Sequence, residues 1–329
     1  MKKVLTTSIL IICPVFFIVL SLFIGIYGIS FGDMINTLLH PLSSDTTLST
    51  VVWDLRFPRA VAAAFCGAAL SVSGAAFQGV FRNPLVNSGI LGVSNGAGFG
   101  ACLAIVFLGG GKMTYISAFL FAVFAVILAY LSGKVGGTSS VVTLILGGTI
   151  VSSFFSALIS ILKVIADPYS QLPSITFWFM GSFASINYSH FIAFIPILTG
   201  ISLIYLCRWR INALSMGAFE AESLGVDTRL YNFLIIGGAT LATSAAVCIS
   251  GTIGWVGLII PHIGRMITGS DNRRLIPVSI SLGASFMIII DLLSRNLSSS
   301  EIPIGILCSL IGAPFFVYLL KKTKGGGWK

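Results

Sequence analysis

Residues 56–100 read RFPRAVAAAFCGAALSVSGAAFQGVFRNPLVNSGILGVSNGAGFG, and this stretch decides the fold. Small or polar side chains recur every three or four residues through its first apolar run, at Gly67, Ser71, Gly74 and Gln78. On a helix these positions share one face, and in lipid such a stripe lets a neighbouring helix approach closely. The stretch therefore predicts an apolar helix that packs tightly inside a membrane bundle.

The same stretch indicates where this helix begins and ends. Pro58 suits the first turn of a helix, where its missing N–H is not needed. Arg82-Asn83-Pro84 forms a polar turn, and the Gly-rich run at 89–100 opens the next apolar segment.

The composition excludes a soluble globular domain. Of the 329 residues, 56% are hydrophobic and 9% are charged, whereas soluble domains carry roughly 25% charged residues. The net charge of +9 would suit nucleic acid or anionic lipid as a partner. The basic residues, however, lie in short loops between apolar runs and form no patch with aromatic residues. No nucleic-acid partner is therefore expected, and the charges indicate membrane topology.

A membrane-spanning helix needs about 20 apolar residues, and ten segments of this kind are found. They are 4–28, 57–80, 88–108, 114–132, 141–163, 189–207, 229–250, 253–268, 275–295 and 302–320. The first is too long for a signal-peptide core and is followed by no small-residue cleavage site. Four residues interrupt the eighth, namely Gly251, Gly254, Gly257 and Pro261. Such a break is tolerated only where protein or a water-filled path covers the backbone.

Ten spans place both termini on the same side of the membrane. With this count, most of the 19 Lys and Arg residues fall on the side of the termini. The others are Arg56, Arg59, Lys112, Lys163 and Arg295. Because basic residues concentrate in cytoplasmic loops, both termini are predicted to be cytoplasmic. We expect one permease domain over residues 1–329, in contact with lipid in the cytoplasmic membrane.

No catalytic or metal-binding constellation is found. The six cysteines lie in or beside apolar spans, without CxxC or Cys/His spacing. Gly109-Gly110-Gly111-Lys112 lacks the Ser or Thr of a phosphate loop and is interpreted as a turn. His40, His190 and His262 are far apart in the sequence, and His262 is interpreted as a polar side chain satisfied within the bundle. The chain is therefore not expected to be an enzyme.

The most polar segment on the predicted inner side is SMGAFEAESLGVDTR, residues 215–229. Met216, Phe219 and Leu224 give it a short apolar face. Asp227 is well placed to cap the N-terminus of the seventh span. From the pattern alone, this segment is equally compatible with an ordinary amphipathic loop.

The stretch at 56–100 resembles the signature region of the FecCD-type permeases, membrane subunits of ABC importers for iron–siderophore complexes, haem and vitamin B12. Two further strings resemble the same family, GTIGWVGLIIPHIGR at 251–265 and EIPIGILCSLIGAPFF at 301–316. With the loop at 220–229, the resemblance covers most of the chain after residue 50. It implies an all-α polytopic fold of ten transmembrane helices in two inverted five-helix halves, similar to a vitamin B12 permease.

The resemblance also implies the partners of the chain. Permeases of this family work as homodimers, with two separate ATP-binding subunits on the cytoplasmic face and a solute-binding protein on the outer face. ATP would bind to those subunits, and no cofactor is expected in this chain. The coupling loop for the ATP-binding subunit would be about 208–229, with contact residues Phe219, Glu220, Glu222, Leu224 and Gly225.

The resemblance assigns Arg56, Arg59 and Arg295 to docking of the solute-binding protein, whose acidic residues they would receive. Each lies near a predicted helix end, where a long side chain can present its charge to water. The alternative is that they anchor helix ends, with Arg295 paired to Asp291 at i, i+4.

The transport path is expected at the dimer interface, lined by the fifth and tenth spans at 143–162 and 304–318. The loop that enters the fifth span holds three small polar residues, Thr138, Ser139 and Ser140. We interpret them as a cytoplasmic gate, with a plain inner turn as the alternative.

The cargo predicted from the resemblance is a ferric siderophore or a related metal chelate, with haem, cobalamin or an oxyanion as alternatives. A self-contained secondary transporter is the rival interpretation. Such carriers usually keep buried acids on an ion path, and none of the ten acidic residues lies near the centre of a predicted span.

Overall fold

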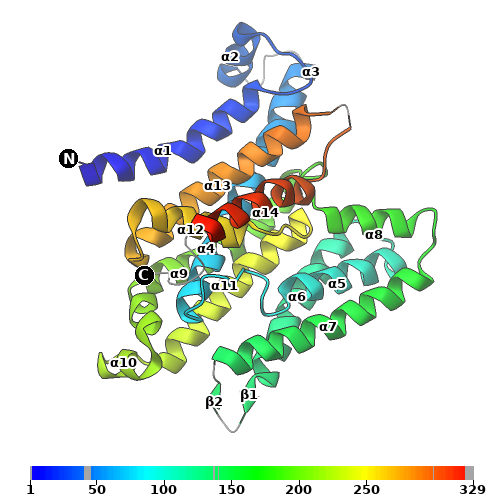
Figure 1. Cartoon of the computed structure of the whole chain (residues 1–329). Helices are drawn as coiled ribbons and strands as arrows, with labels where there is room; N and C mark the ends of the chain where they lie inside the picture. Colours follow the sequence, from blue (N-terminus) through cyan, green and yellow to red (C-terminus); the bar gives the residue numbers. More distant parts are fainter. Residues whose placement is uncertain (1, 41–45, 136–137, 140, 299, 323–329) are drawn as a thin grey trace.

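The computed structural model describes residues 2–40, 46–135, 138–139, 141–298 and 300–322, and the chain forms a helical bundle (Figure 1). In chain order the helices are α1 (Lys2–Phe23), α2 (Phe31–Leu39), α3 (Thr46–Ser49), the π-helical η1 (Thr50–Arg56), α4 (Phe57–Val80), α5 (Val93–Phe107), α6 (Lys112–Ser132), α7 (Val141–Ile165), α8 (Gln171–Met180), the 3-10 helix η2 (Tyr188–Ala193), α9 (Phe194–Met216), α10 (Ala218–Ser223), α11 (Thr228–Ser250), α12 (Val256–Thr268), α13 (Asn272–Asn296) and α14 (Ile304–Lys322). Two short strands, β1 (Lys134–Val135) and β2 (Thr138–Ser139), pair antiparallel between α6 and α7.

The ten predicted spans coincide with ten apolar helices. Within the described part of the chain, six helices are long and apolar enough to cross a membrane, and they contain α4, α6, α7, α9, α11 and α13. The shorter apolar helices lie within α1, α5, α12 and α14. The prediction of an all-α polytopic fold is therefore confirmed, with five apolar helices in each half of the chain.

Three span boundaries were predicted wrongly. The sixth span was expected to end at residue 207, but α9 continues to Met216. The first span was expected to reach residue 28, but α1 ends at Phe23. The third was expected to begin at residue 88, but α5 begins at Val93, after Gly92 with a φ of 86°. The chain before it is occupied by turns, in which the Gly89 N–H donates to Asn87 Oδ1 at 3.0 Å. These polar turns are too short to interrupt an apolar window in the sequence.

Helix α4 packs against α13, α11, α9 and α12 (Figure 1). Nearly all of its side chains are buried. The predicted small-residue stripe is confirmed as its contact face. A Cβ added to Gly67 would overlap the backbone carbonyl of Gly283 on α13, and one on Gly74 would overlap that of Gly257 on α12. Without side chains at these crossings, the three helices approach to backbone contact.

The start of α4 differs from the expectation. Pro58 lies in its first turn, as predicted, but the chain is already helical before it. Residues 47–80 form one continuous helical path of 34 residues, because η1 leads directly into α4. The stretch between the first two predicted spans also contains α2, whose N-terminus is capped by Ser30, since the Asp33 N–H donates to its Oγ at 3.2 Å.

The predicted break in the eighth span is confirmed at Gly251 and Gly254, but not at Gly257 and Pro261, through which α12 continues. Helix α11 ends at Ser250, and α12 begins only at Val256. The intervening backbone is covered by protein, as membrane-buried irregular backbone requires. Thr252 Oγ1 donates to the Phe179 carbonyl at 2.6 Å, and the Ser182 N–H donates to the Ser250 carbonyl at 2.9 Å. The covering residues belong to the end of α8 and to the segment that follows it.

The N-terminus of α13 is fixed to α9 by a polar network. Asp271 caps α13, because the Arg273 N–H donates to its Oδ1 at 3.0 Å. Asn212 on α9 donates to the same carboxylate through Nδ2 at 2.7 Å. The hydrogen bond from the Arg273 side chain and the bond from Asn212 hold the pKa of Asp271 well below its usual range. Asp271 is therefore ionised at neutral pH.

Candidate functional site

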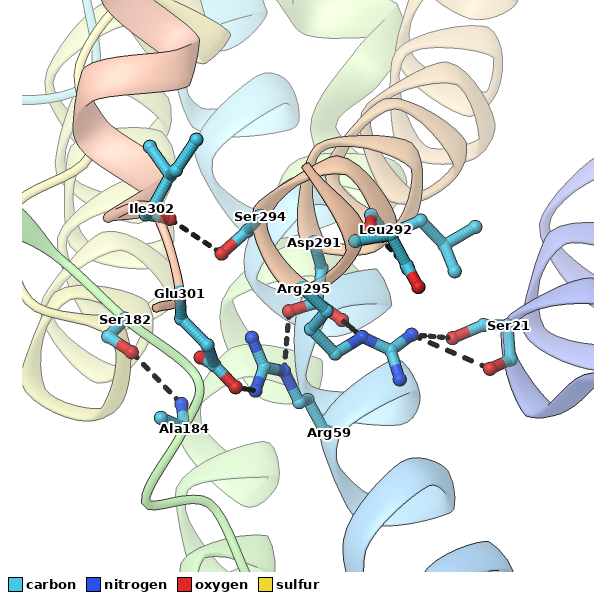
Figure 2. Close-up of polar contacts among 11 residues, drawn as sticks. Ser21, Arg59, Ser182, Ala184, Asp291, Leu292, Ser294, Arg295, Glu301 and Ile302 are labelled. Atoms are coloured by element: carbon cyan, nitrogen blue, oxygen red, sulfur yellow. Dashed lines mark hydrogen bonds and ion pairs between the residues drawn. The ribbon is translucent and has the colours of Figure 1, made fainter. Parts of the chain in front are cut away.

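Arg59 links the start of α4 to two carboxylates from the last third of the chain. Its Nε donates to Asp291 Oδ1 on α13 at 2.6 Å, and its Nη1 donates to Glu301 Oε1 at 2.6 Å (Figure 2). The Asp291 side chain is completely buried, whereas the Glu301 side chain is 38% exposed. Hydrogen bonds between ionised partners are the strong ones in proteins, so Arg59 fixes the loop before α14 to α4.

Arg295 approaches Asp291 from the other side. Its Nε lies 3.2 Å from Asp291 Oδ2, and its Nη2 donates to Ser21 Oγ on α1 at 2.6 Å (Figure 2). Arg56 also reaches α1, because its Nη1 donates to the Leu22 carbonyl at 2.5 Å. We call Arg56, Arg59, Asp291, Arg295 and Glu301 the arginine cluster. It joins α1, α4, α13 and the segment before α14 at one end of the bundle.

The three arginines do not present their charges to water, contrary to the sequence-based expectation. Arg56, Arg59 and Arg295 are 4%, 6% and 8% exposed. For Arg59 and Arg295 the reason is Asp291, a buried carboxylate that needs cationic partners. Arg56 instead donates to the backbone carbonyls of Leu22 and Tyr27. The alternative pairing of Arg295 with Asp291 at i, i+4 is present. The role of the arginines in docking stays a prediction.

Glu301 is the member of the cluster that the sequence did not reveal. The only signal was its position, as the first residue of the third family-like string and directly before α14. A neighbouring contact holds this segment in place, because Ser294 Oγ donates to the Ile302 carbonyl at 2.6 Å (Figure 2). The three cations outnumber the two carboxylates, so the cluster keeps one net positive charge.

Helix α10 lies on a protrusion at the opposite end of the bundle from the arginine cluster (Figure 1). Three apolar side chains in and beside α10 face solvent, since Met216, Phe219 and Leu224 are 61%, 80% and 64% exposed. An exposed apolar patch with a polar rim is typical of a protein-binding surface. We call these three residues the α10 patch.

The polar residues predicted for coupling shape the protrusion. Glu220 and Glu222 are exposed, and Glu222 Oε1 accepts a hydrogen bond from Thr228 Oγ1 at 2.8 Å. Gly225 has a φ of 77°, a backbone conformation that favours glycine. Asp227 caps α11 as predicted, because the Leu230 N–H donates to its Oδ1 at 3.0 Å.

The predicted gate lies at the entrance to α7. Thr138 and Ser139 form β2, which pairs with β1 in the register Lys134 to Ser139 and Val135 to Thr138. Ser140 lies outside the described residues. Thr138 and Ser139 therefore belong to a short antiparallel strand pair, and the gating role stays a prediction.

A buried polar contact connects two of the family-like strings. Arg265 Nη2 on α12 donates to Gln78 Oε1 on α4 at 2.5 Å. Gln78 Nε2 in turn donates to the Gly257 carbonyl at 3.2 Å and to the Val86 carbonyl at 3.0 Å. The sequence placed Gln78 on the small-residue stripe, but it did not indicate Arg265 as its partner.

Comparison with known proteins places these features in one family. Residues 11–322 match the FecCD transport family. The chain is 42% identical to the molybdate import system permease protein MolB of Haemophilus influenzae, over 94% of this chain and 93% of the relative. It is 37% identical to a probable iron chelatin transport system permease protein of Helicobacter pylori, over 85% of each chain. Among solved structures, an inward-facing ABC transporter of metal-chelate type matches with a TM-score of 0.87 and 40% identity, covering 98% of this chain and 100% of the other.

Proposed function

This chain belongs to the FecCD transport family and is a permease subunit of an ABC importer, and from that premise we propose that it carries a ferric siderophore or a related metal chelate. The observation that supports this cargo is the extent of the match, which spans residues 11–322 and includes a relative named for iron chelatin transport. The membrane location follows from the ten apolar helices.

A second cargo, an oxyanion such as molybdate, is favoured by a specific observation. The molybdate permease of Haemophilus influenzae is 42% identical to this chain, whereas the iron chelatin permease is 37% identical. The two candidates differ greatly in size, so a direct uptake measurement separates them.

We propose that two copies of the chain enclose the transport path between their α7 and α14 helices. Both helices carry exposed apolar side chains, for example Ile150 and Phe154 on α7 and Leu310 on α14, which are 64%, 56% and 65% exposed. Those on α7 lie four residues apart and share one helix face. A second copy or lipid has to cover this face.

We propose that α10 faces the cytoplasm, with both termini on the same side, and engages an ATP-binding subunit. The support is the α10 patch, together with Glu220, Glu222 and Gly225 on the same protrusion. ATP binding and hydrolysis on the partner would move α10, and the rigid helix α9 would transmit the movement into the bundle. Thr138 and Ser139, close to the start of α7, would then open or close the inner end of the path.

We further propose that the arginine cluster faces outward and receives a carboxylate from the solute-binding protein. Arg59 Nη2 is buried and has no hydrogen-bond partner among the described residues. Glu301 is partly exposed, so a carboxylate from the partner could compete with it for Arg59.

Replacing Arg56, Arg59 and Arg295 together by Gln, in a chain that also carries Asp291→Asn so that no buried carboxylate is left without a cation, tests docking. This variant should lose binding of the solute-binding protein while the complex keeps its basal ATPase activity. Arg229→Gln removes an exposed charge on the α10 side and is the control. Docking that persists at low salt in the assembled variant would place the site elsewhere.

Uptake into proteoliposomes tests the function as a whole. The complex of this chain with its ATP-binding subunits and solute-binding protein should accumulate radioactive ferric chelate when ATP is present inside. Molybdate should be taken up weakly. Strong molybdate uptake without chelate uptake would establish the second cargo. Uptake that needs an ion gradient but no ATP would contradict the importer proposal and support a secondary transporter.

A further inference from the structure

A wide groove opens on the surface of the bundle between α4, α9 and α13, with Pro14 of α1 at its edge. Its volume is about 930 Å³, within the roughly 300–1,000 Å³ of typical ligand sites. Most of its lining is apolar, including Ala68 on α4, Leu198 and Ile201 on α9, and Ile280 on α13. Inside a membrane, hydrocarbon has to fill such a surface, because water does not enter it favourably.

The groove has the depth of one bilayer leaflet. Along α13 its lining extends from Arg273 to Ala284, a rise of about 16 Å at 1.5 Å per residue. This is about half of the roughly 30 Å hydrocarbon core of a bilayer. One end of the groove therefore lies near the middle of the membrane, and the other end lies at the headgroup level.

The headgroup end is basic and aromatic. Arg273 and Arg274 both line the groove and are exposed. Arg273 is held by Asp271, at 2.9 Å, and lies over the Trp209 ring at 5.2 Å from its centroid. The Arg274 guanidinium forms no hydrogen bond or ion pair with the residues that the structure describes. Tyr205 also lines the groove, and Tyr and Trp are typical of the membrane interface.

We propose that this groove binds an anionic phospholipid, with its acyl chains against α9 and α13 and its phosphate at Arg273 and Arg274. Basic pockets between transmembrane helices bind anionic headgroups in this way. A second copy of the chain fits less well, since it would bring the arginines of two copies together. Under the proposed function, the lipid lies in the cytoplasmic leaflet, where anionic lipids create a negative surface potential.

The position of the groove gives the lipid a mechanical role. Helix α9 leads into α10 through Gly217, and α13 carries two members of the arginine cluster. A lipid between α9 and α13 touches the helices that lead to both ends of the bundle. The anionic lipid content of the membrane would thereby affect how firmly the two ends are connected.

Native mass spectrometry of the delipidated permease tests the proposal. The full chain is titrated with dioleoylphosphatidylglycerol and, separately, with dioleoylphosphatidylcholine. The anionic lipid should bind more tightly, and Arg274→Gln should weaken it by about fivefold, the loss expected for one basic residue near the headgroups. Leu198→Trp should fill the groove and weaken both lipids.

Two controls match these variants. Arg210→Gln removes a charge from α9, close to Asn212, which contacts the start of α13. Arg210 lies over Tyr231 on α11 rather than in the groove. Leu206→Trp adds bulk at an exposed position of α9 that does not line the groove. Neither control should change lipid binding. Equal binding of the two lipids, or equal losses in Arg274→Gln and Arg210→Gln, would overturn the proposal.

A second measurement uses the unmodified protein. Photoactivatable phosphatidylglycerol should label peptides of α9 and α13 at the groove, and millimolar inorganic phosphate should not displace it. Labelling confined to other helices would contradict the proposal. Displacement by inorganic phosphate would indicate a phosphate site, and protection of the groove by self-association would indicate a second copy. Either result would overturn the lipid assignment.

Discussion

At the scale of single residues, Asp291 is the position where substitution should destabilise the fold most. It is completely buried between Arg59 and Arg295, and removing it would leave Arg295 without a carboxylate and Arg59 with Glu301 alone. Breaking a buried ion pair by removing one partner costs about 3–5 kcal/mol. Asp291→Asn keeps the shape of the side chain and should therefore lower the free energy of unfolding by about this amount.

The buried cysteines offer a direct measurement of this effect. Cys66, Cys102, Cys207, Cys248 and Cys308 are buried and unpaired, so a thiol-reactive dye should report their exposure on heating. Asp54→Asn, at an exposed position of η1, is the matched control and should unfold like the wild type. Equal unfolding of the two variants would show that the arginines do not need Asp291.

At the scale of helices, the crossing of α4 and α13 depends on two glycines. A Cβ on Gly67 would meet the backbone carbonyl of Gly283, which cannot move without displacing α13. Gly67→Ala should therefore prevent assembly of a folded bundle. Gly237→Ala on α11 is the control, because a Cβ there meets nothing within 4 Å.

Protease resistance of the permease in membranes checks this prediction. Gly237→Ala should be as resistant as the wild type or more so, since alanine is the better helix former. A fully resistant Gly67→Ala variant would mean that α4 and α13 are further apart than the structure places them.

Helix α10 carries a separate prediction. Phe219→Ala removes the most exposed apolar side chain of the α10 patch and should release the ATP-binding subunit from the membrane. Phe233→Ala removes a ring of 64% exposure from α11 and serves as the control. Co-purification of the two subunits measures the outcome. Normal co-purification of the ATP-binding subunit with Phe219→Ala would show that α10 is not part of the interface.

The sequence predicted elements better than it predicted contacts. The apolar runs, the stripe from Gly67 to Gln78 and the cap at Asp227 depend on neighbours in the chain, and their spacing is visible in the sequence. The bond between Arg59 and Glu301 joins residues 242 positions apart, and no local pattern indicates such a partner. The three arginines predicted for docking were expected in water for the same reason. Helix α2 was missed because it is short and lies in a stretch of mixed polarity.

At the scale of the whole molecule, the topology is the first property to test. In a variant without native cysteines, a thiol at Asp167, next to α8, should react with an impermeant reagent from outside. A thiol at Ser223, at the end of α10, should react only after the membrane is opened. Both positions are exposed, so access to the reagent depends on sidedness. The reverse labelling pattern would show that the membrane orientation is inverted, with the arginine cluster on the cytoplasmic side.

The arginine cluster also has a consequence for how the chain is made. Asp291 is synthesised 232 residues after Arg59, which takes about 10 to 50 seconds at ribosomal rates of 5–20 residues per second. During this interval α4 is already in the membrane, with an unpaired arginine and with the glycine stripe facing no partner helix. The growing chain therefore passes through a stage in which the N-terminal half of the bundle is in the membrane before the C-terminal half has been made. Ribosomes that stall before α13 would leave a fragment that the quality-control proteases of the membrane could recognise by its unpaired charge.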